Sequence, residues 1–500
     1  MKSMLRSISL AWEERPLSII MVLALFFRVL AAVFAKGYGM HDDHFCVIDY
    51  AQQWLKGTLS VIDKGDNVRS LIYPGLHYGL FYALEKIGMF DPQAKMYVVR
   101  FLHALYSLLS VYFGYKTALL LTNRTAARTV GLLLAVFWVF PFMSVRNLIE
   151  FVCIPPMVIG TYLLVLNEAR GGKRFLFLAG AFFGLAFTLR YQTVVFAGAA
   201  AVVYCIKKQW ASAAWYGLGW GVSSLVAQTI SDTLLAHTYP YASFVNACYL
   251  FTVHDDSGYP AGPWYQYIGL LIGVLIPPTS LLLLYGFLTT WKKHALIFWP
   301  TMAFLAIHSM IVNKQERFIL PIVPFVLLLS AIGWEEIAGK SRFWLKRKKL
   351  ARWSWRWFWG VNAVLLCVCS VTYSKKSRVE TLSYLSHKPD VRGVIIETQD
   401  PTPPLAPLFY LGKSAPVFYL TSAKKIEALK AEIDSAAAGR PNYVVFLDQR
   451  NIQRRVQRLS GMFHDLRFEK CIVPSFIDHA LYLMNPKHNV NQSSTIYKCE

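Results

Sequence analysis

The sequence predicts a polytopic α-helical membrane protein with a small α/β domain in its C-terminal part. Hydrophobic residues make up 55% of the 500 residues and charged residues only 16%, whereas about a quarter of the residues of soluble domains are charged. Apolar stretches of roughly twenty residues, the length of a membrane span, recur from Pro16 onward. From about Pro389 the composition changes to short apolar runs and polar helical patterns, which are typical of a small α/β fold.

The formal charge of +22 does not by itself indicate a nucleic-acid partner. Lys and Arg are enriched in the cytoplasmic loops of membrane proteins, where they also face anionic lipids, and we find no nucleic-acid-binding motif. The eight cysteines form no Cys-x-x-Cys pair, and neither a phosphate loop nor a dinucleotide fingerprint occurs, so we expect no metal and no cofactor. Cys471 and Cys499 could form a disulfide in an oxidising compartment, a question that the sequence leaves open.

The first predicted span is about Pro16–Ala35. It is longer than a signal-peptide core and lacks an evident small-residue cleavage site, so we expect it to be retained. Lys2, Arg6 and Arg15 precede it, which places the N-terminus in the cytoplasm by the positive-inside rule. The next apolar segment, Tyr73–Gly88, is short and contains charged residues, and we interpret it as a helix at the membrane interface.

Further spans follow at Met96–Thr122, Ala127–Met143, Leu148–Leu166, Phe175–Leu189, Val194–Ile206, Ala211–Ile230, Tyr265–Thr290, Ala295–Val312, Phe318–Ile337 and Trp357–Thr372. With about eleven spans the basic loops all fall on the N-terminal side, which supports this count. We therefore predict a transmembrane domain over residues 1–374 and a soluble extracytoplasmic α/β domain over residues 375–500. In the latter, VRGVIIE and NYVVFLD predict strands, whereas KKIEALKAEID and Asn451–Leu459 predict helices.

The densest cluster of titratable side chains beside a span is His41–His44, within GMHDDHF, and Asp49 follows in the same segment. A partly desolvated carboxylate near an imidazole is suited to act as a general base for a hydroxyl group. A polar loop that merely leaves a membrane helix is the alternative.

Two more polar clusters lie on the same predicted side. RSLIYP begins at Arg69 and enters the predicted interfacial helix, and NKQERFILP begins at Asn313 and joins two spans. Lys314 and Arg317 are suited to bind an anionic lipid head, because Arg forks two hydrogen bonds onto a phosphate and Lys supplies a point charge. Snorkelling of basic side chains from helix ends is the alternative.

These motifs resemble those of a known family. NKQERFILPI is similar to the HKExRFxxPI signature of the lumenal mannosyltransferases of glycosyltransferase family 22, which build lipid-linked oligosaccharides and GPI anchors. GMHDDHF is similar to the family's His-Pro-Asp-Glu loop after the first span, and RSLIYP to its Arg-Ser-x-x-Tyr-Pro stretch. Weaker similarities, in the family's order, occur at Arg146–Glu150, Arg190–Thr193, Asp232 and Gly262–Tyr267.

The resemblance implies a GT-C architecture and transfer of a hexose, typically mannose, with inversion. The implied donor is a polyprenyl-phosphate sugar, and the acceptor is a lipid-linked glycan or a similar molecule. Asp43 keeps the family's acidic position and is expected to deprotonate the acceptor hydroxyl, with Asp42 as the substitute. Lys314 or Arg317 would stabilise the departing phosphate without a metal. The family's Pro, Glu, His and Glu are replaced by Asp42, His44, Asn313 and Gln315.

The remaining candidate substrate-binding residues in these motifs are His41, His44, Arg69, Tyr73, Trp264 and Glu316. The two histidines could orient a sugar, and the arginine could contact a phosphate or anchor its loop. The aromatic rings, together with Tyr265, offer faces to a sugar or a prenyl chain, although packing and interfacial roles are commoner for such residues.

Two other functions fit the same features. A lipid or sugar transporter, or a flippase, also needs charges within the membrane, but here the charges gather at one surface. A GT-C transferase with another sugar or acceptor would carry similar motifs. The short loops favour a bacterial inner membrane with a periplasmic site, with the endoplasmic reticulum membrane as the alternative. The possible sequon Asn491–Ser493 does not decide between them.

Overall fold

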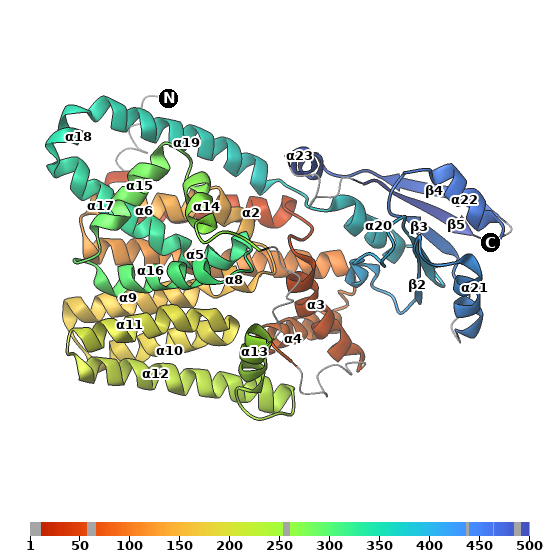
Figure 1. Ribbon diagram of the computed structural model, residues 1–500, viewed down its shortest axis with the longest axis horizontal. Coiled ribbons are helices and arrows are strands. Elements are labelled where there is room, and N and C mark those ends of the chain that lie inside the picture. The colour runs from red at the N-terminus through yellow and green to blue at the C-terminus, as the bar shows by residue number, and fades with distance from the viewer. Residues whose placement is uncertain are drawn as a thin grey trace. The chain divides into compact units, whose positions relative to one another are not determined.

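The computed structural model describes residues 12–57, 67–253, 261–436, 440–463, 465–484 and 492–499, and Figure 1 shows its elements. Lys2, Arg6 and Asn491 lie outside the described residues. The chain divides into a first unit of Met1–Ala32, Thr58–Leu76 and Arg100–Ser370 and a second unit of Val33–Gly57, His77–Val99 and Val371–Glu500. The second unit thus includes segments from early in the sequence, and the boundary expected between residues 374 and 375 stays a prediction.

The first unit is helical. Its α-helices are α2 (Pro16–Phe34), α5 (Pro92–Leu121), α6 (Arg124–Val136), α7 (Val139–Ser144), α8 (Ile149–Val152), α9 (Ile154–Arg170), α10 (Lys173–Leu189), α11 (Val194–Ile206), α12 (Trp210–Gln228), α13 (Ala242–Val253), α14 (Gln266–Val274), α15 (Thr279–Thr289), α16 (Ala295–Met310), α17 (Val323–Lys340), α18 (Arg342–Lys346) and α19 (Lys348–Ser370). Short 3₁₀ or π segments are η2 (Tyr191–Thr193), η3 (Thr229–Leu235) and η4 (Glu316–Ile322). The first residues of α5 belong to the second unit.

Among the described residues, four helical segments are long and apolar enough to cross a membrane: Pro16–Phe34, Pro92–Leu121, Ile149–Arg170 and Glu316–Lys340. The pair α14 and α15 would make a fifth, but its two helices are bent by 117°. The chain is therefore a multi-pass membrane protein. Several other segments predicted to span form shorter or less apolar helices, and the count of about eleven stays a prediction.

Two predicted spans are not continuous helices. Tyr265–Thr290 is bent because Pro277 and Pro278 stand between α14 and α15, and proline cannot donate a helical backbone hydrogen bond; that this segment spans the membrane stays a prediction. Ala127–Met143 is interrupted because α6 ends before Phe137 and α7 begins at Val139, and its crossing of the membrane stays a prediction. Asn362 of α19 forms hydrogen bonds with the backbone groups at this break. Its Nδ2 donates to Val136 O at 2.8 Å, and its Oδ1 accepts from Trp138 N at 3.0 Å. A break inside an apolar bundle needs such partners.

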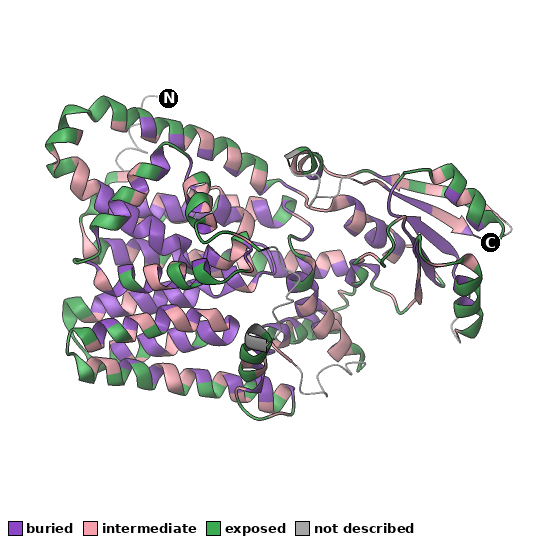
Figure 2. Ribbon diagram, viewed as in Figure 1, coloured by how far each residue is buried: buried purple, intermediate pink, exposed green. Residues whose placement is uncertain are grey.

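Small residues let helices of the first unit pack closely. A Cβ atom on Gly180 of α10 would lie 2.0 Å from Tyr216 O, and one on Gly219 of α12 would lie 1.9 Å from Phe177 O. Glycines at such contacts are typical of membrane helices, because packing replaces the hydrophobic effect there. In Figure 2, α17 is buried from Val323 to Trp334, whereas much of α12 and α19 is exposed. The exposed apolar side chains of these outer helices suit contact with lipid.

The second unit contains a mixed sheet with helices on both faces. Its elements are α3 (His41–Lys56), α4 (Ile72–Lys86, which begins in the first unit), α20 (Lys376–Ser386), β1 (Val394–Glu397), η5 (Leu408–Leu411), β2 (Val417–Leu420), α21 (Ile426–Ser435), β3 (Tyr443–Phe446), α22 (Ile452–Ser460), β4 (Leu466–Ile472), α23 (Phe476–Met484) and β5 (Ser494–Cys499). The strand order is β2-β1-β3-β5-β4, with β2, β1 and β3 parallel and the other pairings antiparallel.

The central strands β1 and β3 are buried along their whole length, as their continuous apolar runs predict. One face packs against α3, α4 and α20, and the other packs against α21 and α22. The strands predicted at VRGVIIE and NYVVFLD and the two predicted helices of this region are confirmed. Cys471 of β4 and Cys499 of β5 are both free thiols.

Candidate active site

The cluster His41–His44 begins a helix. Met40 has an extended backbone, and α3 then runs to Lys56 and ends at Gly57, whose φ is 65°. Asp42 and Asp43 lie in the first turn, where negative charge is favoured by the helix dipole. The interpretation of this cluster as a loop is therefore wrong, because its acidic residues are also typical of a helix start.

The two adjacent aspartates have different surroundings. The side chain of Asp42 is 62% exposed, whereas Asp43 is 4% exposed. His44 is buried and stacks on Tyr38, with ring centroids 5.9 Å apart. Asp43 and His44 are thus enclosed by protein, and Asp42 meets solvent.

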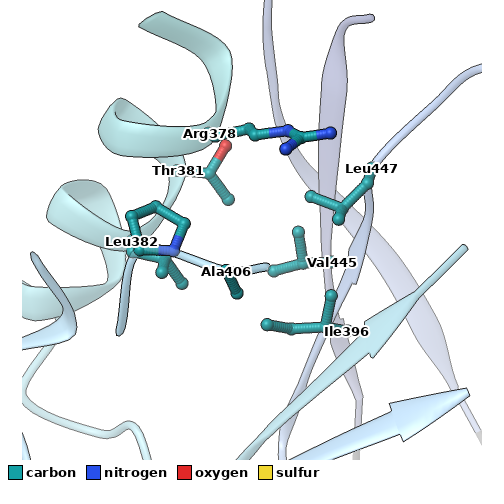
Figure 3. Close-up of a pocket in the computed structure, with 8 residues that line it drawn as sticks. Arg378, Thr381, Leu382, Ile396, Ala406, Val445 and Leu447 are labelled. Atoms are coloured by element: carbon teal, nitrogen blue, oxygen red, sulfur yellow. The ribbon is translucent and has the colours of Figure 1, made fainter. Parts of the chain in front are cut away.

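His41 links this turn to the segment before η5. Its Nε2 lies 3.4 Å from Ala406 O, and its Nδ1 lies 3.6 Å from Asp42 Oδ1. Burial lowers the pKa of His41, although these two neighbours oppose the shift. A small, mainly apolar pocket lies beside Ala406, and Figure 3 shows Arg378 of α20 on one side and Val445 of β3 on the other.

Lys375 was not a sequence candidate, yet it lies beside the first turn of α3. Its Nζ donates to Gly39 O at 2.9 Å and lies 4.6 Å from the ring centroid of Tyr38. Burial lowers the pKa of Lys375 to about 8. Its backbone is left-handed with φ 53°, a conformation that costs energy in a residue other than glycine. The preceding Ser374 pairs with Gly37 in a parallel bridge, which ties this lysine to the entrance of α3.

The first unit contains a buried ion cluster. Glu150 of α8 is 1% exposed, and its Oε1 lies 2.7 Å from Arg190 Nη1 and 3.2 Å from Arg317 Nε. Both guanidinium groups also lie against Phe318, with Cζ 5.4 Å and 5.5 Å from its ring centroid. Three segments that are far apart in the sequence therefore converge on one carboxylate.

Lys314 lies in the same motif as Arg317 and is also buried. Its Nζ donates to Ile311 O, and a Cβ on Gly262 would lie 3.2 Å from its Cδ. Burial lowers the pKa of Lys314. Tyr267 OH donates to Gln315 O at 3.2 Å. The structure thus brings together the motifs at Gly262–Tyr267 and Asn313–Phe318, whereas Trp264 and Glu316 are exposed.

The Arg69–Tyr73 segment is fixed by hydrogen bonds within the first unit. Arg69 N donates to Asn67 Oδ1 at 3.2 Å, and Leu71 N donates to Ser231 Oγ at 2.8 Å. Tyr73 is buried and its hydroxyl lies 3.0 Å from His103 Nε2. Its ring stacks on that imidazole, so packing accounts for much of the ring's surface.

Asp232 lies in one of the weakly similar motifs, and its carboxylate accepts several hydrogen bonds. It is fully buried in η3 and accepts from Ser231 Oγ at 2.8 Å and from Ser243 Oγ at 2.7 Å. Ser231 in turn holds Leu71, and Ser243 Oγ lies 2.5 Å from Tyr191 OH. Asp232 therefore connects the RSLIYP motif to the segment that follows Arg190.

The candidate residues fall into two groups, each within one unit. The second unit holds His41, Asp42, Asp43 and His44, and the first unit holds Arg69, Tyr73, Trp264, Lys314, Glu316 and Arg317. The sequence did not indicate Lys375, and it indicated Arg190 and Glu150 only as members of weakly similar motifs. Their importance depends on pairings across long stretches of sequence, which no local pattern reveals.

A model of the Alg9-like mannosyltransferase family matches residues 19–392 of this chain. The chain belongs to this family. The match confirms the resemblance to glycosyltransferase family 22. This Alg9-like chain is therefore a glycosyltransferase. It is 29% identical over 129 residues to GPI alpha-1,2-mannosyltransferase 3 of Danio rerio. That alignment covers 25% of this chain and 23% of the relative, so the chain spans about a quarter of the curated relative that it matches.

The GT-C fold expected for this Alg9-like chain is confirmed by solved structures. ArnT from Cupriavidus metallidurans, bound to undecaprenyl phosphate, superposes with a TM-score of 0.60 at 12% identity over 96% of this chain and 97% of that chain. The archaeal oligosaccharyltransferase AglB from Archaeoglobus fulgidus, in complex with an inhibitory peptide and a dolichol-phosphate, gives a TM-score of 0.51 at 11% identity over 87% of this chain and 70% of that chain. At these identities the likeness concerns the fold.

Proposed function

We propose that this protein transfers a hexose, most simply mannose, from a polyprenyl-phosphate sugar to a lipid-linked glycan or a similar acceptor. The observation that carries the proposal is the burial of Asp43 in the first turn of α3, directly after the first apolar helix and within the family match. The two solved relatives contain undecaprenyl phosphate and a dolichol-phosphate, which supports a lipid phosphate as the carrier.

In the proposed reaction Asp43 accepts the proton of the acceptor hydroxyl as its oxygen attacks the anomeric carbon. The bond between that carbon and the phosphate oxygen breaks, and the polyprenyl phosphate leaves as an anion. Because the attack comes from the opposite face, the anomeric configuration is inverted. The leaving group needs no proton, and Lys314 and Arg317 stabilise its charge.

The other candidates have supporting roles in this proposal. His41 and His44 orient a sugar beside Asp43, and Asp42 serves as the substitute base. Arg69 anchors its loop or contacts the phosphate. Tyr73, Trp264 and Glu316 contact the substrate in this proposal, and the two exposed residues, Trp264 and Glu316, meet a lipid chain or an acceptor.

We place the reaction on the extracytoplasmic side, with residues 375–500 as a soluble domain on that side. The Alg9-like family favours an endoplasmic reticulum membrane over the bacterial inner membrane that the short loops suggested.

The test is transfer of radiolabelled sugar by the purified chain in detergent, with lipid extract of the native host as the acceptor source. Dolichyl-phosphate mannose, dolichyl-phosphate glucose and GDP-mannose are compared as donors. We expect label to move from dolichyl-phosphate mannose into an acceptor lipid and none to move from GDP-mannose. Efficient use of GDP-mannose, or movement of the lipid across a vesicle membrane without any covalent change, would refute the proposal.

A further inference from the structure

The buried ion cluster of the first unit holds more positive than negative charge. One carboxylate, Glu150, is shared by the guanidinium groups of Arg190 and Arg317, and the side chains of all three are at most 10% exposed. Burying charge is costly, and holding two like charges on one oxygen adds repulsion. An arrangement of this kind suits a site that a further anion completes.

Part of the Arg190 guanidinium lacks a hydrogen-bond partner among the described residues. Glu150 contacts its Nη1, whereas Nε and Nη2 are buried and have no hydrogen-bond partner among the described residues. A buried donor without a partner costs about 1–3 kcal/mol. The Nε and Nη2 groups form one side of the planar guanidinium, and their two N–H bonds match the spacing of two oxygens of a phosphate.

The position of this edge is fixed on two sides. Glu150 holds Nη1 at 2.7 Å, and the ring of Phe318 lies against the guanidinium. The second oxygen of Glu150, Oε2, likewise has no partner among the described residues. Glu150 therefore holds Nη1 of Arg190 and makes no hydrogen bond to the Nε and Nη2 edge.

We infer that Arg190 binds the phosphate group of the lipid-linked donor through its Nε and Nη2 edge, and that Glu150 is the residue that positions it. This inference rests on the proposed function and deepens it, because it adds a second guanidinium to Arg317 at the leaving group. Lys314 supplies a compact charge from the same segment as Arg317.

The experiment measures binding rather than transfer. Geranyl phosphate, inorganic phosphate and geraniol are titrated into the purified full chain in detergent, and the dissociation constants are obtained by calorimetry. The variants are Arg190→Gln, Arg190→Lys, Glu150→Gln and the double variant Glu150→Gln/Arg190→Gln. Arg128→Gln is the matched control, because Arg128 lies outside this ion cluster and its partner Glu13 is exposed. Circular dichroism and size-exclusion chromatography check the fold of each variant.

We expect geranyl phosphate to bind wild type and Arg128→Gln equally and geraniol to bind far more weakly. Arg190→Gln should weaken geranyl phosphate binding at least tenfold. Arg190→Lys keeps the charge but loses the two parallel N–H donors, so its loss of geranyl phosphate affinity should be intermediate. If Arg190→Gln does not fold, the affinity of Arg190→Lys tests the inference instead. If Glu150 acts through Arg190, the double variant should bind no more weakly than Arg190→Gln alone.

The outcomes separate this inference from the proposed function. Unchanged phosphate affinity in folded Arg190 variants would overturn the inference while transfer by wild type still supports the function. If inorganic phosphate binds in a manner that depends on Arg190 but no sugar is transferred from dolichyl-phosphate mannose, Arg190 is still an anion site. The proposal that this lipid is the donor would then be wrong. Failure of wild type to bind either phosphate would overturn the inference directly.

Discussion

Asp42 and Asp43 are neighbours in the first turn of α3, yet the side chain of Asp42 is 62% exposed and Asp43 is 4% exposed. Solvation stabilises an exposed carboxylate and weakens its interaction with other charges, whereas a buried one can be held in a fixed orientation. The proposed reaction therefore assigns the base role to Asp43.

Replacing Asp43 with Asn should lower kcat by at least two orders of magnitude, because a near-isosteric amide cannot accept the acceptor's proton. Donor binding should change little. Asp42→Asn is the matched control and should keep most of the activity. Single-turnover transfer from dolichyl-phosphate mannose measures both. Loss of activity in Asp42→Asn alone would move the base to Asp42.

Asp49 of α3 should make the second unit less stable at high pH. Burial raises the pKa of Asp49 to about 7, although Lys56 opposes the shift. Between about pH 4 and pH 7 the unfolded chain has released this proton and the folded chain has kept it, so the free energy of unfolding falls as pH rises through this window.

Asp49→Asn removes that dependence. At pH 8 the variant should be more stable than wild type by roughly 1–4 kcal/mol, and at pH 4 the two should be equal. Thermal unfolding in detergent at both pH values measures the difference. Asp434→Asn, at an exposed position, is the control. An equal effect of Asp49→Asn at pH 4 and pH 8 would contradict the assignment.

Arg455 of α22 stabilises the parallel end of the sheet. Its Nε lies 2.9 Å from Glu397 Oε2, and its Nη1 lies 2.7 Å from Asp448 Oδ1. All three residues are buried. Arg455→Met leaves Glu397 in the interior without its cation and leaves Asp448 with Arg450 alone, so it should cost about 3–5 kcal/mol.

Hydrogen–deuterium exchange of β1 and β3 measures this loss locally. Protection should fall in Arg455→Met and recover partly as the pH is lowered, because burial raises the pKa of Glu397 and this carboxylate then takes up a proton. Arg467→Met is the control, because Arg467 pairs with Asp465 at the surface and such pairs contribute little. Equal effects of the two substitutions would show that burial of the cluster is unimportant.

Gly180 should be needed for the contact between α10 and α12. A leucine there would place atoms against the backbone of Tyr216, whose oxygen lies 2.0 Å from the position of a Cβ. We expect Gly180→Leu to lower the thermal midpoint in detergent by several degrees, since overpacking costs about 1–3 kcal/mol. Gly198→Leu is the control because its Cβ would meet no atom within 4 Å. No difference between the two variants would contradict the close contact.

Local patterns predicted most long helices of the first unit, although not α13, and the buried strands of the second. Long apolar runs determine both, so α5 and β3 follow from the sequence directly. The break after α6 does not, because it depends on Asn362 of a distant helix. β4 is mostly exposed and lacks the apolar run that identifies a central strand.

The candidate site divides in the same way. A motif identifies Asp43 and Arg317, because residue type and spacing carry the information. Arg190 pairs with Glu150, forty residues earlier in the chain, and Lys375 donates a hydrogen bond to Gly39. Only folding brings these partners together, so local sequence cannot assign their roles.

The discontinuity of the second unit sets an order for biosynthesis. Phe45 and Ile48 of α3 pack in the same core as Ile496 of β5, so the ribosome must complete β5 before α3 can bury its apolar side. Contacts between such distant parts of a chain form late. A nascent chain whose membrane helices are already inserted therefore still lacks the packing around Asp43, and the candidate base becomes ordered only after β5 has been synthesised.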